Sequence, residues 1–193
     1  WQGEPRGGRP LVLLHSGIVY PSERDPTALM DALASLKSAG RIREGQFVIR
    51  FRAPVHADLI TGLAQARGVA AFVEIAPSVP YKAAIAEMTS VDALLVMQGQ
   101  NCNAQIPAKL YEYLRAGRPM LGLADPAGDT GRTMLDVGVP HVATLEDASA
   151  IERTLPDFVD SLARDAVPTV PRARIERYSR RALTGALAGL LDR

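Results

Sequence analysis

The chain has 193 residues, 47 % of them hydrophobic, and a formal net charge of +1 at pH 7. This length suits one domain with a short tail, and the hydrophobic share is too high for a disordered chain. The near balance of charge gives no reason to expect a nucleic-acid partner, which usually requires a clustered basic surface.

Short apolar runs alternate with amphipathic segments along the chain. After an N-terminal loop or linker at 1–10, rich in Gly, Arg and Pro, the strand candidates are 11–14, 47–51, 71–75, 92–97, 119–123 and 141–143. Helical spacing of apolar residues predicts helices over 26–39, 57–67, 80–88, 107–116, 129–137, 148–163 and 175–191. We therefore expect an α/β fold, a Rossmann-like three-layer sandwich with a parallel sheet of about six strands and helices on both faces.

The predicted sheet belongs to one domain, 11–170, followed by a C-terminal helix within 171–193. The run 92–97 has no polar alternation, which suits a central parallel strand covered on both faces. In such sheets ligands bind at the carboxyl ends of the strands, near the point where the strand order reverses. The residues just after each strand are therefore the candidates for a site.

The first strand is followed by His15, Gly17 and, further on, Arg24. A glycine at a strand end lets the backbone approach a ligand closely, and an arginine before a helix can reach a phosphate with forked donors. A plain turn glycine and a surface arginine are the alternatives. Neither the G-x-G-x-x-G fingerprint nor a P-loop occurs here. After the second strand, solvated side chains are the favoured interpretation of Arg50 and Arg52.

The strongest pattern follows the run 92–97. An amide-rich loop, 98–105, leads into a helix at Pro107, whose free N–H groups and positive dipole end suit a diphosphate. Lys109 and Glu112 share a face of that helix, and a carboxylate at Glu112 could accept hydrogen bonds from two ribose hydroxyls. A surface ion pair between Lys109 and Glu112 is the alternative, and the spacing alone leaves both open.

The segment 106–119, IPAKLYEYLRAGRP, resembles the signature helix of the GT-B retaining glycosyltransferases related to family four. Weaker similarity at 17–26 and around Tyr178 extends the resemblance to roughly residues 10–192. The resemblance implies a C-terminal domain that binds a nucleotide-diphosphate sugar. One position departs from the family: Ala104 stands where many members carry a second glutamate that helps to bind the sugar.

The resemblance also assigns roles to individual residues. Arg24 and Lys109 would bind the diphosphate and act as the catalytic cations, and Glu112 would hold the ribose. Gly17 would be the point of close backbone approach. The remaining candidates contact either the nucleobase or the sugar: they are Glu74 and Tyr81 for the base, and Asn103 and Gln105 for the sugar.

The implied activity is transfer of a hexose-type sugar from a nucleotide-diphosphate donor to an acceptor hydroxyl, with no cofactor and no metal. An N-terminal acceptor-binding domain would be the missing partner, since the chain begins at Trp1 rather than at Met, and the isolated chain would turn over little. Two alternatives remain: a non-catalytic Rossmann-like interaction or regulatory domain, and a nucleotide-sugar epimerase.

The cellular setting is expected from composition alone. The single cysteine, Cys102, excludes a disulfide within the chain and suits a reduced, cytoplasmic location. The sequence has no signal-peptide pattern and no long apolar run, so we expect at most peripheral contact of the full-length protein with the inner face of a membrane.

Overall fold

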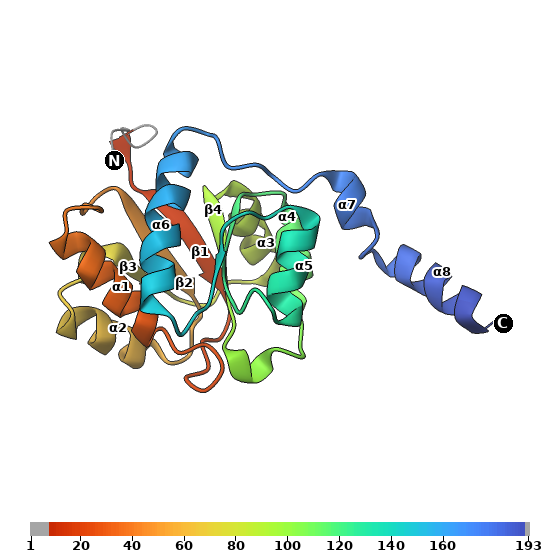
Figure 1. Cartoon of the computed structure of the whole chain (residues 1–193), viewed down its shortest axis with the longest axis horizontal. Helices are drawn as coiled ribbons and strands as arrows, with labels where there is room; N and C mark the ends of the chain where they lie inside the picture. Colours follow the sequence, from red (N-terminus) through yellow and green to blue (C-terminus); the bar gives the residue numbers. More distant parts are fainter. Residues whose placement is uncertain (1–7, 192–193) are drawn as a thin grey trace.

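The computed structural model describes residues 8–191, so most of the loop expected at 1–10 lies outside the described residues. The strands are β1 (Leu11–Ser16), β2 (Phe47–Arg52), β3 (Val73–Ala76), β4 (Ala93–Met97), β5 (Met120–Leu123) and β6 (Val142–Ala143). They form one six-stranded sheet in the order β3-β2-β1-β4-β5-β6, and every neighbouring pair is parallel (Figure 1). The predicted α/β architecture is confirmed.

Helices follow the strands in alternation. They are α1 (Thr27–Ser38), α2 (Ala57–Ala66), α3 (Tyr81–Ser90), α4 (Ala108–Ala116), α5 (Asp129–Val137), α6 (Ala148–Ala163), α7 (Arg172–Glu176) and α8 (Arg180–Leu191), with short 3-10 turns η2 (Ala70–Phe72) and η3 (Gln100–Cys102). The third strand begins later than predicted because η2 occupies its first expected residues.

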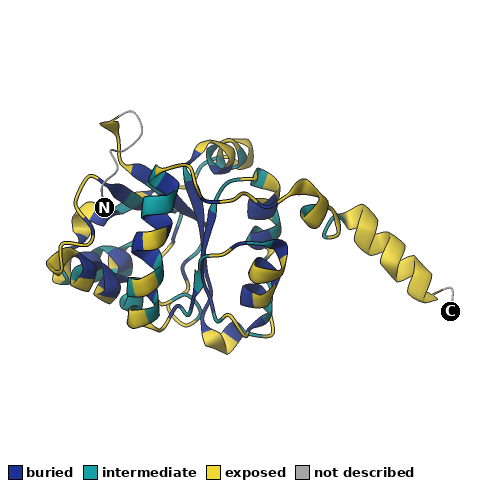
Figure 2. Cartoon of the chain, turned by 45° about the horizontal axis from the view of Figure 1, so that its top comes forward, coloured by how far each residue is buried: buried dark blue, intermediate teal, exposed yellow. Residues whose placement is uncertain are grey.

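Two apolar layers hold the helices against the sheet. Buried residues of α1, α2 and α6 pack on one face, and buried residues of α3, α4 and α5 pack on the other. Strand β4 supplies both layers, since Leu95 belongs to the first and Leu94 and Val96 to the second. Figure 2 shows the buried strands between the partly exposed helices. The prediction of a central strand covered on both faces is therefore confirmed.

Strand β2 is apolar on one face only. Its phenylalanines and Ile49 enter the layer beneath α1 and α2, whereas Arg50 and Arg52 both face α3 on the opposite side. Residues two apart in a strand point the same way, so the two arginines share one face. The prediction that these side chains are solvated is wrong, because their side chains are only 25 % and 14 % exposed and both are ion-paired.

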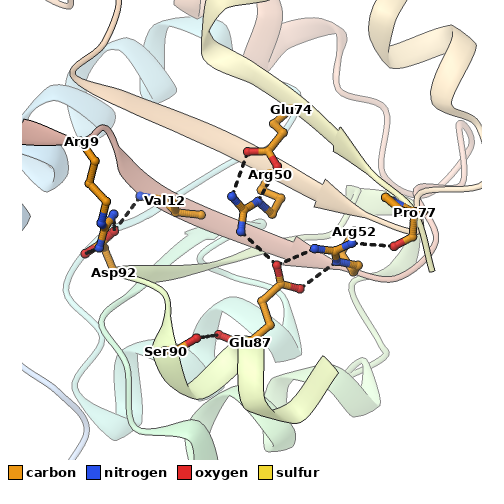
Figure 3. Close-up of polar contacts among 9 residues, drawn as sticks. All are labelled: Arg9, Val12, Arg50, Arg52, Glu74, Pro77, Glu87, Ser90 and Asp92. Atoms are coloured by element: carbon orange, nitrogen blue, oxygen red, sulfur yellow. Dashed lines mark hydrogen bonds and ion pairs between the residues drawn. The ribbon is translucent and has the colours of Figure 1, made fainter. Parts of the chain in front are cut away.

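Glu87 of α3 is the centre of that ion-pair network (Figure 3). Its carboxylate accepts two hydrogen bonds from Arg52, at 2.8 and 2.7 Å, and one from Arg50 at 3.1 Å. Arg50 also forms a two-bond pair with Glu74 of β3. These contacts join α3 to β2 and β2 to β3.

The C-terminal segment differs from the predicted single helix over 175–191. It forms two helices, α7 and α8, separated at residues 177–179, and the hydroxyl of Ser179 accepts a hydrogen bond from the N–H of Ala182. That contact caps α8 as a new helix. Figures 1 and 2 show α8 extending away from the sandwich, and its leucines are exposed. No helix in the described part of the chain is long and apolar enough to cross a membrane.

Candidate functional site

The strand order reverses between β1 and β4, which lie side by side at the centre of the sheet. The connections after these two strands leave in opposite directions, and this creates a crevice at their carboxyl ends. The crevice therefore receives the segment that starts at Gly17 and the loop that leads from Gln98 into α4.

His15 and Lys109 meet at this crevice. His15 is fully buried, and its Nδ1 lies 3.0 Å from the carbonyl oxygen of Leu95. Because a carbonyl only accepts, Nδ1 carries the proton, and Nε2 is left to accept a hydrogen bond from the Nζ of Lys109 at 3.0 Å. Burial, followed by the charge of Lys109, holds the pKa of His15 well below its usual range, so the ring is neutral.

Gly17 lies directly against the end of the Lys109 side chain. A Cβ placed on Gly17 would be 3.4 Å from Nζ, and the residue has a φ of +109°, which side chains rarely adopt. Just before it, the N–H of Ser16 donates to the hydroxyl of Tyr113 at 2.7 Å, which ties α4 to the end of β1. The glycine thus provides a backbone conformation that side chains rarely adopt, directly beside the end of the Lys109 side chain.

Arg24 brings a second cation to the same place. Its side chain is 13 % exposed, its Nη1 lies 3.2 Å from Glu23, and its guanidinium lies 5.6 Å from the ring centre of Tyr20. Its Nε is buried and has no hydrogen-bond partner in the described structure. The pKa of Lys109 is lowered to about 7 by burial and then by the charge of Arg24, while Glu112 opposes the shift. We call His15, Gly17, Arg24 and Lys109 the Lys109 site.

Glu112 lies one turn along α4 from Lys109, and it is exposed. It forms no ion pair within residues 8–191, so the alternative of a Lys109–Glu112 surface ion pair is wrong: the ammonium donates to His15 instead. Helix α4 begins after Pro107, whose extended backbone carries no side-chain cap among the described residues. A free carboxylate and an uncapped helix start therefore flank the Lys109 site.

The loop 98–105 is held in shape by its own amides. The buried Gln98 side chain donates to the carbonyl oxygens of Cys102 and Gln105 and accepts from Thr130 at 2.9 Å. Asn103, a candidate for sugar contacts, donates to Asp125 at 2.6 Å. The side chain of Gln105, the other candidate, is exposed beside it.

Two of these loop contacts escaped the sequence patterns. The burial of Gln98 could not be predicted, because every neighbouring position in the loop is polar or small. Glu146, which precedes α6, accepts a hydrogen bond from the N–H of Gln100 at 2.7 Å. A glycine at 99 is required there, because a Cβ would lie 2.9 Å from the Glu146 carboxylate and 3.0 Å from the carbonyl oxygen of Glu23.

The two nucleobase candidates belong to β3 and to the helix that follows it, and β3 is separated from β1 by β2 in the sheet. Glu74 is in the edge strand β3, and its carboxylate is engaged by Arg50. Tyr81 is the first residue of α3 and is 71 % exposed. No hydrogen bond or ion pair within the described residues joins either of them to Lys109 or Arg24, and their base-binding role stays a prediction.

A groove of about 1070 Å³ lies between α4 and the C-terminal helices. Glu112 and Arg115 of α4 line one side, and Tyr178 and Arg181 line the other. Its arginines are exposed, in contrast to the partly buried Lys109. Among the residues that the structure describes, no group of three or more His, Cys, Asp or Glu side chains comes together as a metal site.

No family model matches the sequence, and no curated protein matches it. Solved structures do share its fold. Sucrose-phosphate synthase from Thermosynechococcus elongatus matches 95 % of this chain and 45 % of its own, with a TM-score of 0.63 and 14 % identity. The lipopolysaccharide outer core galactosyltransferase WaaB matches 93 % of this chain and 48 % of its own, with a TM-score of 0.63 and 16 % identity.

A third structure matches along nearly its whole length. The catalytic domain of cholesterol-α-glucosyltransferase from Helicobacter pylori is 17 % identical, with a TM-score of 0.58, and the match covers 91 % of this chain and 98 % of that one. The chain thus spans about half the length of the first two structures. These neighbours are GT-B glycosyltransferases, and the chain shares their Rossmann-like α/β fold.

Proposed function

We propose that this chain is the donor-binding half of a glycosyltransferase, which transfers a sugar from a nucleotide-diphosphate donor to an acceptor hydroxyl. The observation that carries the proposal is the Lys109 site itself. Two cations, Lys109 and Arg24, converge at the switch point of the sheet, and no carboxylate contacts the Nζ of Lys109 among the described residues. An anionic ligand supplies the negative charge that this arrangement lacks.

The chemistry of a diphosphate fits the site. Lys109 and the guanidinium of Arg24 can each donate to phosphate oxygens, and the start of α4 adds a favourable dipole. When the bond to the sugar breaks, negative charge grows on the departing diphosphate, and cations already aimed at it stabilise that charge without reorganisation. Glu112, on the next turn of the helix and exposed, would accept hydrogen bonds from ribose hydroxyls.

The acceptor side of the reaction belongs, in this proposal, to a partner domain. Support comes from the match to about half of the sucrose-phosphate synthase and WaaB chains. The exposed leucines of α8 offer an apolar surface for such a domain. We propose a cytoplasmic enzyme that needs neither metal nor organic cofactor, whose isolated donor half binds nucleotide sugar and turns over little.

Calorimetric titration of the chain with UDP-glucose and GDP-mannose tests the proposal. We expect binding of at least one of them, weakened about 10- to 100-fold by Glu112→Ala, because hydrogen bonds to a charged group contribute about 1.5–3 kcal/mol. Asp136→Ala, which removes an exposed carboxylate of α5, is the matched control and should bind as the parent chain does. Absence of binding at millimolar ligand would instead favour the non-catalytic interaction domain.

A further inference from the structure

His15 is a polar residue in the buried core, where a polar side chain costs free energy unless it forms hydrogen bonds. Its ring is fully buried at the end of β1, tilted against Phe51 at 6.0 Å between ring centres. Both nitrogens nevertheless have partners, one in β4 and one in α4. Because Leu95 fixes the tautomer, the only acceptor that the ring can offer points at the Nζ of Lys109.

The charges around Lys109 come from three elements. Arg24, from the β1–α1 connection, repels the ammonium, and Glu23 beside it is paired with Arg24. Glu112, on α4 itself, attracts the ammonium without contacting it. His15, on β1, is neutral and accepts its hydrogen bond. The ammonium is therefore held by a neutral partner, and its charge is left unbalanced.

We propose that His15 is a positioning residue that holds Lys109 ready for the donor diphosphate, and that the diphosphate draws a proton from solvent onto Lys109 as it binds. This inference rests on the proposed function and adds a regulation to it: donor binding tightens on the acid side of neutrality. No covalent bond forms or breaks in this step.

The direction of the pH effect follows from the local charges. In the free protein the pKa of Lys109 is about 7, so the side chain is mostly neutral at pH 8. A diphosphate beside Nζ favours the ammonium and raises that pKa. Between pH 7 and the raised value, the complex then holds more protons than the free protein, and the affinity falls by up to about tenfold for each pH unit.

The test is calorimetry with UDP-glucose and GDP-mannose from pH 6 to pH 8.5, in two phosphate-free buffers with different heats of ionisation. These donors carry an unchanging phosphate charge across that range, so a change in affinity reports on the protein. We expect the dissociation constant to rise five- to tenfold from pH 7.5 to 8.5, with net proton uptake at pH 8. Lys109→Arg, whose guanidinium stays charged, should flatten the profile.

Variants at position 15 separate positioning from a purely structural role. His15→Leu removes the acceptor and should move the midpoint of the pH profile to lower pH, whereas His15→Gln places an amide oxygen where Nε2 lies and should restore it. His56→Gln, at an exposed histidine before α2, is the matched control. If His15→Leu does not fold, the His15→Gln and Lys109→Arg profiles still decide the matter.

Two different failures are distinguishable. If neither nucleotide sugar binds at any pH, the proposed function is wrong together with this inference. If binding is observed with no proton uptake and an affinity that is constant from pH 6.5 to 8.5, the function stands and the inference is overturned. His15→Leu could instead leave the midpoint of the pH profile unchanged and alter the affinity by the same factor at every pH. That result would also overturn the role given to His15.

Discussion

The hydroxyl of Tyr113 accepts a hydrogen bond from the N–H of Ser16 at 2.7 Å, and this contact joins the helix that carries Lys109 to the end of β1, just before Gly17. The tyrosine is fully buried, and burial raises the pKa of its hydroxyl, so it stays protonated. This buried contact therefore helps to fix the relative position of α4 and the end of β1.

Tyr113→Phe should lower the free energy of unfolding by about 1–3 kcal/mol, because the Ser16 N–H then loses its partner in a largely buried position. Urea denaturation measures the change. Tyr111→Phe is the control, since the hydroxyl of Tyr111 has no hydrogen bond within the described residues, and it should change stability by less than about 0.5 kcal/mol. Equal effects of the two substitutions would contradict the role given to the Ser16 contact.

Glu87→Ala should destabilise the chain by about 1–3 kcal/mol at pH 7, because it leaves Arg50 and Arg52 partly buried without their shared carboxylate. Arg52, the largest contributor, and then Arg50 lower the pKa of Glu87. Its contribution is therefore present above the unfolded value of 4.5 and is lost as pH falls through the lowered folded value. Thermal melts at pH 7 and pH 3 should differ less for Glu87→Ala than for the parent chain, and an equal difference would count against the network.

Gly17→Ala should cost about 1–3 kcal/mol of stability, because the φ of +109° strains any side chain. It should also weaken nucleotide binding, since the added methyl group would lie 3.4 Å from the Nζ of Lys109. Gly62→Ala is the matched control: this glycine lies within α2 with no atom near its missing Cβ, and alanine there should raise stability by about 0.5–1 kcal/mol. Denaturation and calorimetry on the same samples check both effects.

Lys109→Met should raise stability at pH 7 while it weakens nucleotide binding. Burial lowers the pKa of Lys109 from 10.5 to about 7, so folding disfavours the charged form. The unfolded chain binds more protons between these two values, and the stability of the parent chain therefore rises with pH across that window. The advantage of Lys109→Met should shrink as pH approaches 10, and an advantage that stays constant with pH would show that Lys109 does not titrate as described.

The sheet could be predicted from sequence because its signals are local. The run 93–97 has no alternation of apolar and polar residues, which indicates a buried strand. Gly117 and Gly138 were predicted as helix stops, and both end a helix in the structure, with φ values of +67° and +99°. The break between α7 and α8 escaped prediction, because the apolar spacing continues through Tyr178 and no Gly or Pro marks the interruption.

The candidate site was only half visible in the sequence. Gly17 and Arg24 could be recognised because they follow the first predicted strand. Lys109 and Glu112 could be recognised because they share one face of a predicted helix. The partner of Lys109, however, is His15, which lies 94 positions away and meets it only once β1 and α4 have packed. Such pairings depend on the register of distant elements, so no local pattern reports them.

A crystal structure of the chain with the nucleotide sugar that binds more tightly decides whether the Lys109 site binds the donor diphosphate. We expect diphosphate oxygens within hydrogen-bond distance of the Nζ of Lys109 and the guanidinium of Arg24, with the ribose hydroxyls at Glu112. A nucleotide seated instead in the groove between α4 and the C-terminal helices, with Lys109 still bonded to His15 alone, would contradict it.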